Sequence, residues 1–306
     1  MENMIQSISN FFKTNTEKLR DAAKIGDLQN VKALIRAGAD LNAPAGNEGF
    51  TALILAAQNG HVEVAQYLVE AGAELDAKGQ WHKTALLFAA QEGHLEVAEY
   101  LVGAGADLEA KNEFGTTALM LAAQEGHVGV AQYLVGAGAD LEARSSSISS
   151  IVNMSGLFGM TALMWARKYN HAKVAQYLED AAAQALAKSE LMINAARTNN
   201  IRELERLVAT GTDINSKDYR GYTALMGAAQ EGHVAVAQYL VGAGADLAAR
   251  SSSISSIVNM SGLFGMTALM WARKNKHAEV VQYLEAAAAE LVIVQAIVQE
   301  PANERA

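Results

Sequence analysis

The tripeptide Thr-Ala-Leu recurs along this 306-residue chain, and its spacing constrains the fold more than any other feature. Its six copies are separated by steps of 33, 33, 44, 62 and 44 residues and begin at Thr51, Thr84, Thr117, Thr161, Thr223 and Thr267. A step of 44 is one 33-residue unit with 11 inserted residues, and the step of 62 contains one further unit in which Ser189-Glu190-Leu191 replaces the tripeptide. Glu17-Lys18-Leu19 replaces it at the start. The sequence therefore predicts eight units of one design, since a fixed period of this length is typical of solenoid repeats.

Each complete unit has the pattern of two short helices. In the unit that begins at Thr117, the first helix is expected to end at Gly126, because glycine adopts the left-handed conformation that terminates a helix. A second helix, ending at Gly138, follows from the i, i+3, i+4, i+7 spacing of the apolar residues between 128 and 135. One such unit cannot bury its own apolar face, so the core must lie between neighbours.

This pattern resembles the ankyrin repeat over roughly residues 17 to 290. The resemblance implies an all-α solenoid of about eight helix-turn-helix units with finger loops, and a non-catalytic scaffold that binds a partner protein on its concave face. Alanine stands where the family's Thr-Pro-Leu-His turn has proline. We expect apolar packing in place of the family's Thr–His hydrogen bond, because the histidine of that turn is replaced by Ile54, Leu87, Met120, Met164, Met226 and Met270.

Residues 122–179 and 228–285 are near-copies, and the repeat pattern falters between them. The usual Gly-Ala-Asp exit is missing after Leu178, and residues 179–188 read as a continued, alanine-rich helix. We predict two sub-arrays, one at 17–187 with a finger insertion at 145–159 and one at 188–298 with a finger insertion at 251–265. An amphipathic capping segment (1–16) precedes them, and a disordered tail (299–306) follows. The alternative is one continuous solenoid with a degenerate finger.

Composition excludes several classes of function. The net charge of −9 argues against a nucleic-acid partner and suits a basic or neutral protein surface. With no cysteine, the chain has no disulfide, no thiolate nucleophile and no cysteine-bound metal. No run of 18 apolar residues and no secretory signal are evident, so we expect no membrane partner and a cytoplasmic location, with export as an effector left open.

The polar residues do not predict a catalytic or metal site. Six of the seven histidines occupy one repeat position, directly after the turn between the helices, and the resemblance implies that they bond backbone of the neighbouring repeat. Their spacing of one repeat keeps them from sharing a metal ion. The glutamates at 92, 125 and 231 form a stripe along the array rather than a carboxylate pair in one pocket. We expect no cofactor.

The two insertions are identical in sequence and carry exposed apolar residues on projecting loops. Either each loop folds back against Trp165 or Trp271, or it contacts a partner or a second copy of the chain. A self-associating structural protein that uses these loops and the apolar C-terminal segment is the alternative function.

The predicted partner-binding residues are mostly aromatic side chains on fingers and first helices, which give large contact area at low entropic cost. They are Trp81, His82, Phe88, Phe114, Trp165, Tyr169, Tyr219, Tyr222 and Trp271, with Ile148, Ile151, Val152, Leu157 and Phe158 of the first insertion and Ile254, Ile257, Val258, Leu263 and Phe264 of the second.

Overall fold

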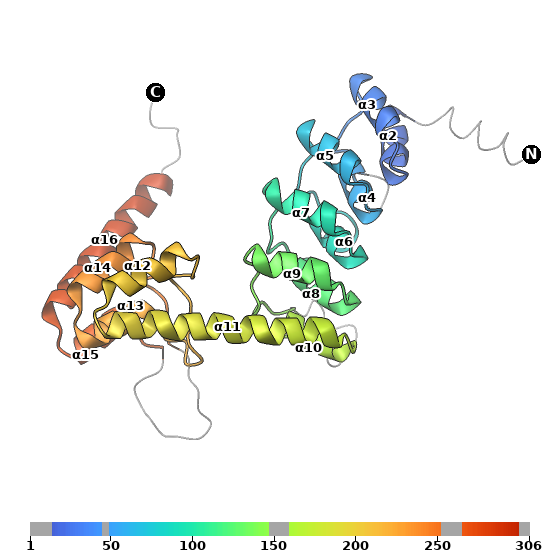
Figure 1. Ribbon diagram of the computed structural model, residues 1–306. Helices are drawn as coiled ribbons and strands as arrows, with labels where there is room; N and C mark the ends of the chain where they lie inside the picture. Colours follow the sequence, from blue (N-terminus) through green and yellow to red (C-terminus); the bar gives the residue numbers. More distant parts are fainter. Residues whose placement is uncertain (1–13, 45–48, 147–158, 252–264, 300–306) are drawn as a thin grey trace, which may run out of the picture. The chain divides into compact units, whose positions relative to one another are not determined.

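The computed structural model describes residues 14–44, 49–146, 159–251 and 265–299, with side chains up to residue 292 (Figure 1). Over these ranges it contains fifteen α-helices, one 3-10 turn and no β-strand, which confirms the predicted all-α solenoid. The chain divides into two compact units, residues 1–181 (unit 1) and 182–306 (unit 2), and the division falls inside a single helix, α11. The sequence placed this boundary at 187/188.

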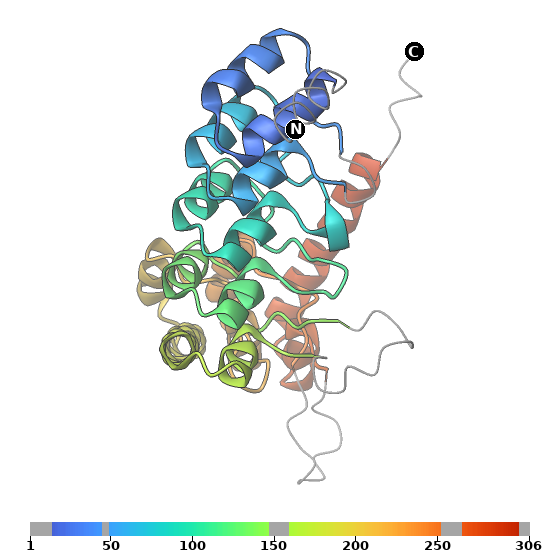
Figure 2. The same cartoon turned by 90° about the vertical axis from the view of Figure 1, so that its right-hand side faces the viewer.

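Unit 1 is a stack of helix pairs, each joined to the next by a finger. Figure 2 shows the pairs following one another, with first helix packed on first helix and second helix on second. The pairs are α2 (Asn15–Lys24) with α3 (Leu28–Arg36), α4 (Ala52–Gln58) with α5 (Val62–Glu70), α6 (Ala85–Glu92) with α7 (Leu95–Gly103), α8 (Ala118–Glu125) with α9 (Val128–Gly136), and α10 (Ala162–Lys168) with the first part of α11 (Ala172–Arg197). The 3-10 turn η2 (Gln80–His82) lies in the finger before α6.

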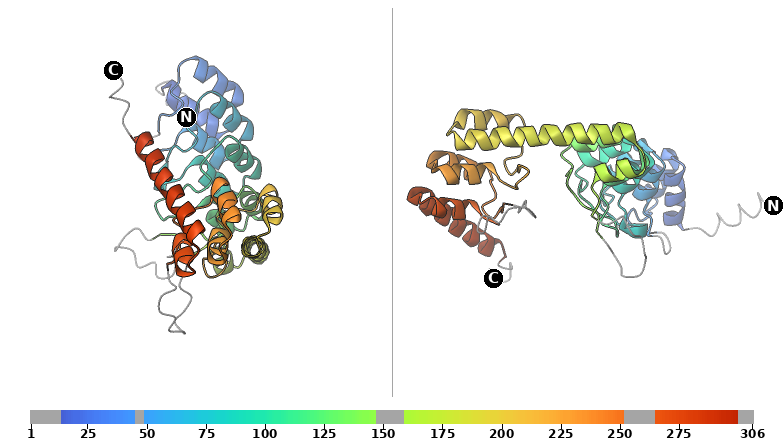
Figure 3. Two further views of the ribbon diagram at one scale, coloured as in Figure 1. Left: turned by 90° about the vertical axis from the view of Figure 1, so that its left-hand side faces the viewer. Right: turned by 90° about the horizontal axis from the view of Figure 1, so that it is seen from below.

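Unit 2 repeats this design with its own core. It comprises the second part of α11 with α12 (Ile201–Ala209), α13 (Ala224–Glu231) with α14 (Val234–Gly242), and α15 (Ala268–Lys274) with α16 (Ala278–Gln299). The left panel of Figure 3 shows α16 extending past the shorter helices of its unit. The core of unit 1 ends at Leu178 and that of unit 2 starts at Met192. Within α11, residues 181–188 contribute no apolar side chain to either core.

The recurring threonine is the N-cap of each first helix. In five of the six copies its hydroxyl accepts a hydrogen bond from the backbone N–H three residues on, as Thr117 does from Met120. Such a cap contributes about 1 kcal/mol to helix stability. The expected apolar packing three residues after the threonine is present at residues 54, 87, 120 and 226, which are buried. It is wrong for Met164 and Met270, each 43% exposed, because no further first helix of the same unit packs beyond α10 or α15.

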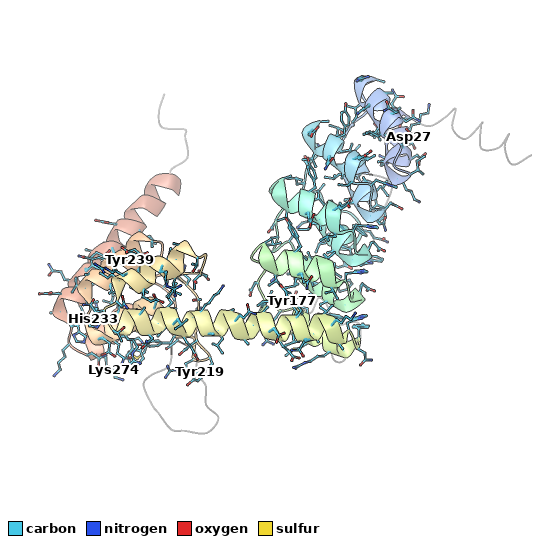
Figure 4. The ribbon with its side chains drawn as sticks, viewed as in Figure 1. Asp27, Tyr177, Tyr219, His233, Tyr239 and Lys274 are labelled. Atoms are coloured by element: carbon cyan, nitrogen blue, oxygen red, sulfur yellow. The ribbon has the colours of Figure 1, made fainter. Side chains whose placement is uncertain are left out.

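The histidine column ties each repeat to the one before it. Nε2 of His127 donates to the backbone carbonyl of Gln91 at 2.9 Å, and four other histidines make the same bond at 2.9–3.1 Å: His61, His94, His233 and His277. Figure 4 labels His233 at the start of α14. The structural interpretation of these histidines is therefore confirmed at five positions. Because a carbonyl oxygen only accepts, Nε2 carries the proton in each.

The same rings explain the glycines at the turns between the helices. Gly126 has φ of +81°, and a Cβ built on it would lie 2.3 Å from Nδ1 of His171 in the next repeat. A Cβ at the corresponding glycines, Gly26, Gly60, Gly93 and Gly232, would lie 2.5–2.6 Å from a histidine ring. Glycine is thus required twice here, once by the left-handed backbone and once by the close approach of the ring.

Repeat 6 begins one residue later than the sequence suggested. Helix α12 starts after the N-cap Asn200, and this cap has the place that histidine has in the other repeats. The register therefore puts Glu190-Leu191-Met192 at the Thr-Ala-Leu position, which agrees with a buried Met192 and a Leu191 that is 50% exposed. The N-cap signal is missing from the sequence because α11 runs through this point without ending.

Three turns between helices use a residue other than glycine, and one of them is Asn199 before α12, with φ of 59°. At the other two, the structure confirms the left-handed backbone that the sequence predicted. Asn170 has φ of 62° and Lys276 has φ of 63°. Both precede a helix, α11 or α16, that continues without a finger exit. We expect Lys276→Gly to stabilise the protein by about 1 kcal/mol, because lysine pays for the left-handed conformation and glycine does not. Asn170→Gly should gain less. Urea unfolding measures both, and a lower midpoint for Lys276→Gly would contradict this account of the turn.

Replacing a bridging histidine should weaken the stack. His127→Ala removes the hydrogen bond to the Gln91 carbonyl, so we expect a loss of on the order of 1 kcal/mol in unfolding free energy, or more if the carbonyl is left buried without a donor. The matched control is Gln132→Ala, an exposed position on α9, which should change stability by less than about 0.5 kcal/mol. Equal effects from the two substitutions would show that the histidine bond does not hold the repeats together.

Candidate binding pocket

A pocket of about 440 Å3 lies on the finger side of unit 1, where three successive repeats meet. Fingers form one wall and the first helices α6, α8 and α10 form the other. We call it the finger pocket, and its lining consists of Trp81, Lys83, Gln91, Asn112, Phe114, Thr116, Leu121, Gln124, Ser145, Ser146 and Trp165. The pocket thus combines aromatic and aliphatic walls with amide, hydroxyl and ammonium groups, which is the usual composition of a site that binds a ligand with defined orientation.

Backbone hydrogen bonds hold the fingers side by side. The N–H of Glu113 donates to the carbonyl of Trp81, and the N–H of Ser146 donates to the carbonyl of Phe114, both at 3.0 Å. Within the middle finger, the side-chain oxygen of Asn112 accepts from two backbone N–H groups at 2.9 Å. These bonds fix the aromatic finger tips although Trp81 is 48% and Phe114 45% exposed.

The finger before α6 has an unusual backbone. At the position of His82, five other fingers have glycine with φ of 64–67°: Gly49, Gly115, Gly159, Gly221 and Gly265. His82 keeps this conformation with φ of 58°, and Trp81 before it has φ of 57°. Each left-handed non-glycine residue costs about 1–3 kcal/mol, so the rest of the finger must stabilise this shape. In the sequence, the only sign of this backbone is that histidine stands at a position where the other fingers have glycine.

Lys83 is the charged group of the pocket, and sequence reasoning missed it. It is 7% exposed, its Nζ donates to Oε1 of Gln91, and it lies 5.2 Å from the ring centroids of Trp81 and Phe88. Among the described residues, no carboxylate forms a salt bridge with it. Burial lowers the pKa of the Lys83 ammonium, and the charges of Glu92 and Glu125 partly offset that effect.

Trp165 closes the pocket on the α10 side. Its ring is 6% exposed and stacks on Tyr169, with centroids 5.8 Å apart and planes 9° from parallel. In the part of the chain that the structure describes, its indole N–H has no acceptor. The same holds for Trp271 of unit 2, which lies 5.1 Å from the Nζ of Lys274, labelled in Figure 4.

In unit 2, tyrosine takes the place of Lys83. The hydroxyl of Tyr222 lies 2.6 Å from Oε1 of Gln230, and its ring meets Trp271 edge to face at 5.5 Å. Burial raises the pKa of this tyrosine, so it stays neutral. Next to it, Arg220 forms an ion pair with Asp218 and lies 5.2 Å from the ring of Tyr219, also labelled in Figure 4. This unit therefore offers an exposed tyrosine and a paired arginine, with no buried ammonium at the lysine position.

The structure sorts the predicted contact residues into three groups. Trp81, His82, Phe114, Tyr169 and Tyr219 are exposed, and Trp271 is half-buried. Phe88, Trp165 and Tyr222 were predicted on the exposed contact surface, but the structure buries them. Phe88 packs against Phe50 and beneath Lys83, while the two others pack on neighbouring rings. The predicted residues of the insertions lie outside the described residues: Ile148, Ile151, Val152, Leu157, Phe158, Ile254, Ile257, Val258, Leu263 and Phe264.

Stacked helix pairs joined by fingers define a repeat solenoid. Family models of ankyrin repeats match the chain at residues 19–112, 75–145, 104–189 and 180–251 in a three-copy form, and at 228–285 in a many-copy form. The chain therefore belongs to the ankyrin-repeat family. Ankyrin repeats are protein–protein interaction modules, and the family is generally not enzymatic.

Similar curated proteins share only part of the array. The human mitochondrial disaggregase is 46% identical over 59 residues, which is 19% of this chain and 8% of that protein. Mouse ankyrin repeat domain-containing protein 40 is 37% identical over 71 residues (22% of this chain, 20% of that protein). Human ankyrin repeat domain-containing protein 39 is 47% identical over 57 residues (19% and 31%). The chain thus spans less than a third of the length of each of these relatives in the matched region.

Among the residues that the structure describes, no cluster of three or more histidine or acidic side chains is placed to hold a metal ion. Within the same ranges, no helix combines the length and the apolar character needed to span a bilayer.

The left-handed finger tip can be tested by restoring its glycine. His82→Gly should raise the free energy of unfolding by about 1 kcal/mol, because it relieves one left-handed non-glycine residue. Gly115→His, the reverse change in the next finger, should destabilise strongly, since a Cβ at Gly115 would lie 2.1 Å from Oγ of Ser146. Chemical denaturation of both variants measures the difference. A destabilised His82→Gly would show that the imidazole makes contacts that outweigh the backbone cost.

Proposed function

We propose that this chain captures a partner protein through the concave face of unit 1, with the finger pocket at the centre of the contact. The observation that carries the proposal is the pocket itself, because it places Trp81 and Phe114, both nearly half exposed, around a cavity that three repeats build together. Tryptophan in a partly enclosed, apolar setting is typical of the residues that dominate binding energy.

The fixed fingers support binding rather than packing as the role of these aromatics. The backbone bonds from Glu113 and Ser146 order the fingers before any partner arrives, so little backbone entropy remains to be lost on association. The net charge of −9 favours a partner with a basic or neutral surface around the contact.

Site-specific photo-cross-linking tests this proposal. A benzophenone amino acid is placed at Phe114 on the finger side, or at Gln132 on the opposite helix row as the matched control, and the full chain is irradiated in an extract of its native host. We expect a discrete adduct from position 114 that unlabelled protein competes away, and none from position 132. The Trp81→Ala substitution should reduce the adduct at 114.

Adducts from position 132 alone would contradict binding on the concave face. Self-association is the second candidate, and it is favoured by Leu291 and Val292 of α16, which are 54% and 66% exposed. An adduct of twice the chain's mass would identify a second copy as the occupant and support this candidate instead.

A further inference from the structure

We infer that the finger pocket recognises a peptide segment of the partner that presents a carboxylate beside a bulky apolar side chain. The carboxylate pairs with Lys83, and the apolar side chain packs against Phe114, Leu121 and the ring of Trp165. This inference rests on the proposed function and names the chemistry of the segment that the concave face would bind.

Folding does not need a charge at position 83. The residue before the capping threonine is uncharged in the five other repeats that carry the Thr-Ala-Leu signature: Phe50, Thr116, Met160, Tyr222 and Met266. In unit 2, the neutral hydroxyl of Tyr222 contacts Gln230 just as the ammonium of Lys83 contacts Gln91. The lysine is therefore a feature of this pocket and not of the repeat.

Among the described residues, no carboxylate forms an ion pair with Lys83. Its hydrogen-bond acceptor is a neutral amide and its other neighbours are two aromatic rings, so a buried ammonium is only partly compensated. Oε1 of Glu92 accepts from Nε2 of Gln91 at 3.0 Å, and Oε1 of Glu125 accepts from Nε2 of Gln124 at 2.7 Å. These carboxylates bond amides rather than the lysine, and they favour its protonated form.

The indole of Trp165 offers a second polar group to a ligand. It lines the same pocket, is more than nine-tenths buried, and has an N–H without an acceptor among the described residues. A buried donor of this kind is usually satisfied in the functional complex. A carboxylate offers several acceptor sites, so it can serve a donor as well as a cation. The indole N–H of Trp271 in unit 2 likewise has no acceptor among the described residues, and its ring contacts Tyr222, which takes the place of Lys83.

The walls define what must accompany the carboxylate. Phe114 is 45% exposed at the rim, while Leu121 is 4% exposed on the floor, so an apolar side chain that enters the pocket removes aromatic surface from water. The left-handed pair Trp81–His82 places the Trp81 ring over the Lys83 ammonium and so limits its access to water.

Four synthetic peptides, each acetylated at its N-terminus, test the inference on the full chain. Acetyl-Gly-Asp-Phe-Gly-amide is compared with its Asn counterpart, and acetyl-Gly-Gly-Phe with a free carboxylate is compared with its amide. Binding is followed by heteronuclear NMR shifts and tryptophan fluorescence. We expect the carboxylate member of at least one pair to bind about tenfold more tightly, and the pair that shows this preference tells whether a side chain or a chain terminus is the source.

Variants assign the effect to the pocket. Lys83→Met, which installs the residue found at this position before α10 and α15, should fold normally and should bind both members of a pair equally. Lys111→Met, the same charge change on an exposed finger residue, should keep the preference. Trp165→Phe keeps an aromatic ring, although a smaller one, and removes the N–H, so it should weaken the carboxylate peptide several-fold more than its neutral counterpart.

Three results would overturn the inference. They are equal or absent binding of charged and neutral peptides, an unchanged preference in Lys83→Met, and a preference that appears only after residues 148–158 are deleted. The last would identify the chain's own insertion as the occupant of the pocket. None of these results touches the cross-linking test, in which an adduct at Phe114 alone would still support concave-face binding.

Discussion

The structure depends on one close approach, that of a histidine ring to the glycine turn of the preceding repeat. The ring nitrogen donates to a carbonyl of that turn, and the ring lies where a Cβ would otherwise be. A Cβ on the turn glycine would meet the ring, and the loss of the ring strands the carbonyl. At one interface the turn has Asn199 instead of glycine, and His233 still bonds the carbonyl of Arg197. The histidine bond is present at five interfaces, where it sets how tightly neighbouring helix pairs stack and hence where the fingers lie. The finger pocket exists because three successive repeats obey it.

Departures from the rule mark the ends of the units. Asn170 and Lys276 replace the turn glycine where the following helix runs on instead of returning through a finger, and Met164 and Met270 become exposed in the same two repeats. In both places the repeat lacks a stacked neighbour on one side within its unit, so no histidine ring of a following repeat approaches the turn. The left-handed backbone is then the one remaining reason for glycine at this position.

Much of the fold could be predicted from the sequence because it depends on local chemistry that repeats. Threonine caps, turn glycines and helical periodicity each recur, and together they predicted the helix pairs, the structural histidines and the left-handed Lys276. The register of repeat 6 was off by one residue because Glu190 lies inside a continuous helix, where no cap signal exists. The candidate site was harder to predict, since burial depends on neighbours that are distant in sequence. Phe88 and Trp165 were predicted on the contact surface but are buried, and no sequence pattern singled out Lys83, which the structure places against the ring of Trp81.

The continuous helix α11 has a consequence for how such a chain can grow. Its middle, residues 181–188, supplies no apolar side chain to either core, so each unit completes its own packing on its own side of this stretch. The near-copies 122–179 and 228–285 both end where a second helix runs on without a finger. A block that ends in this way can be duplicated and joined in frame through helix alone, with no new interface to optimise at the junction. Such a joint makes the genetic gain or loss of a whole group of repeats compatible with a folded protein.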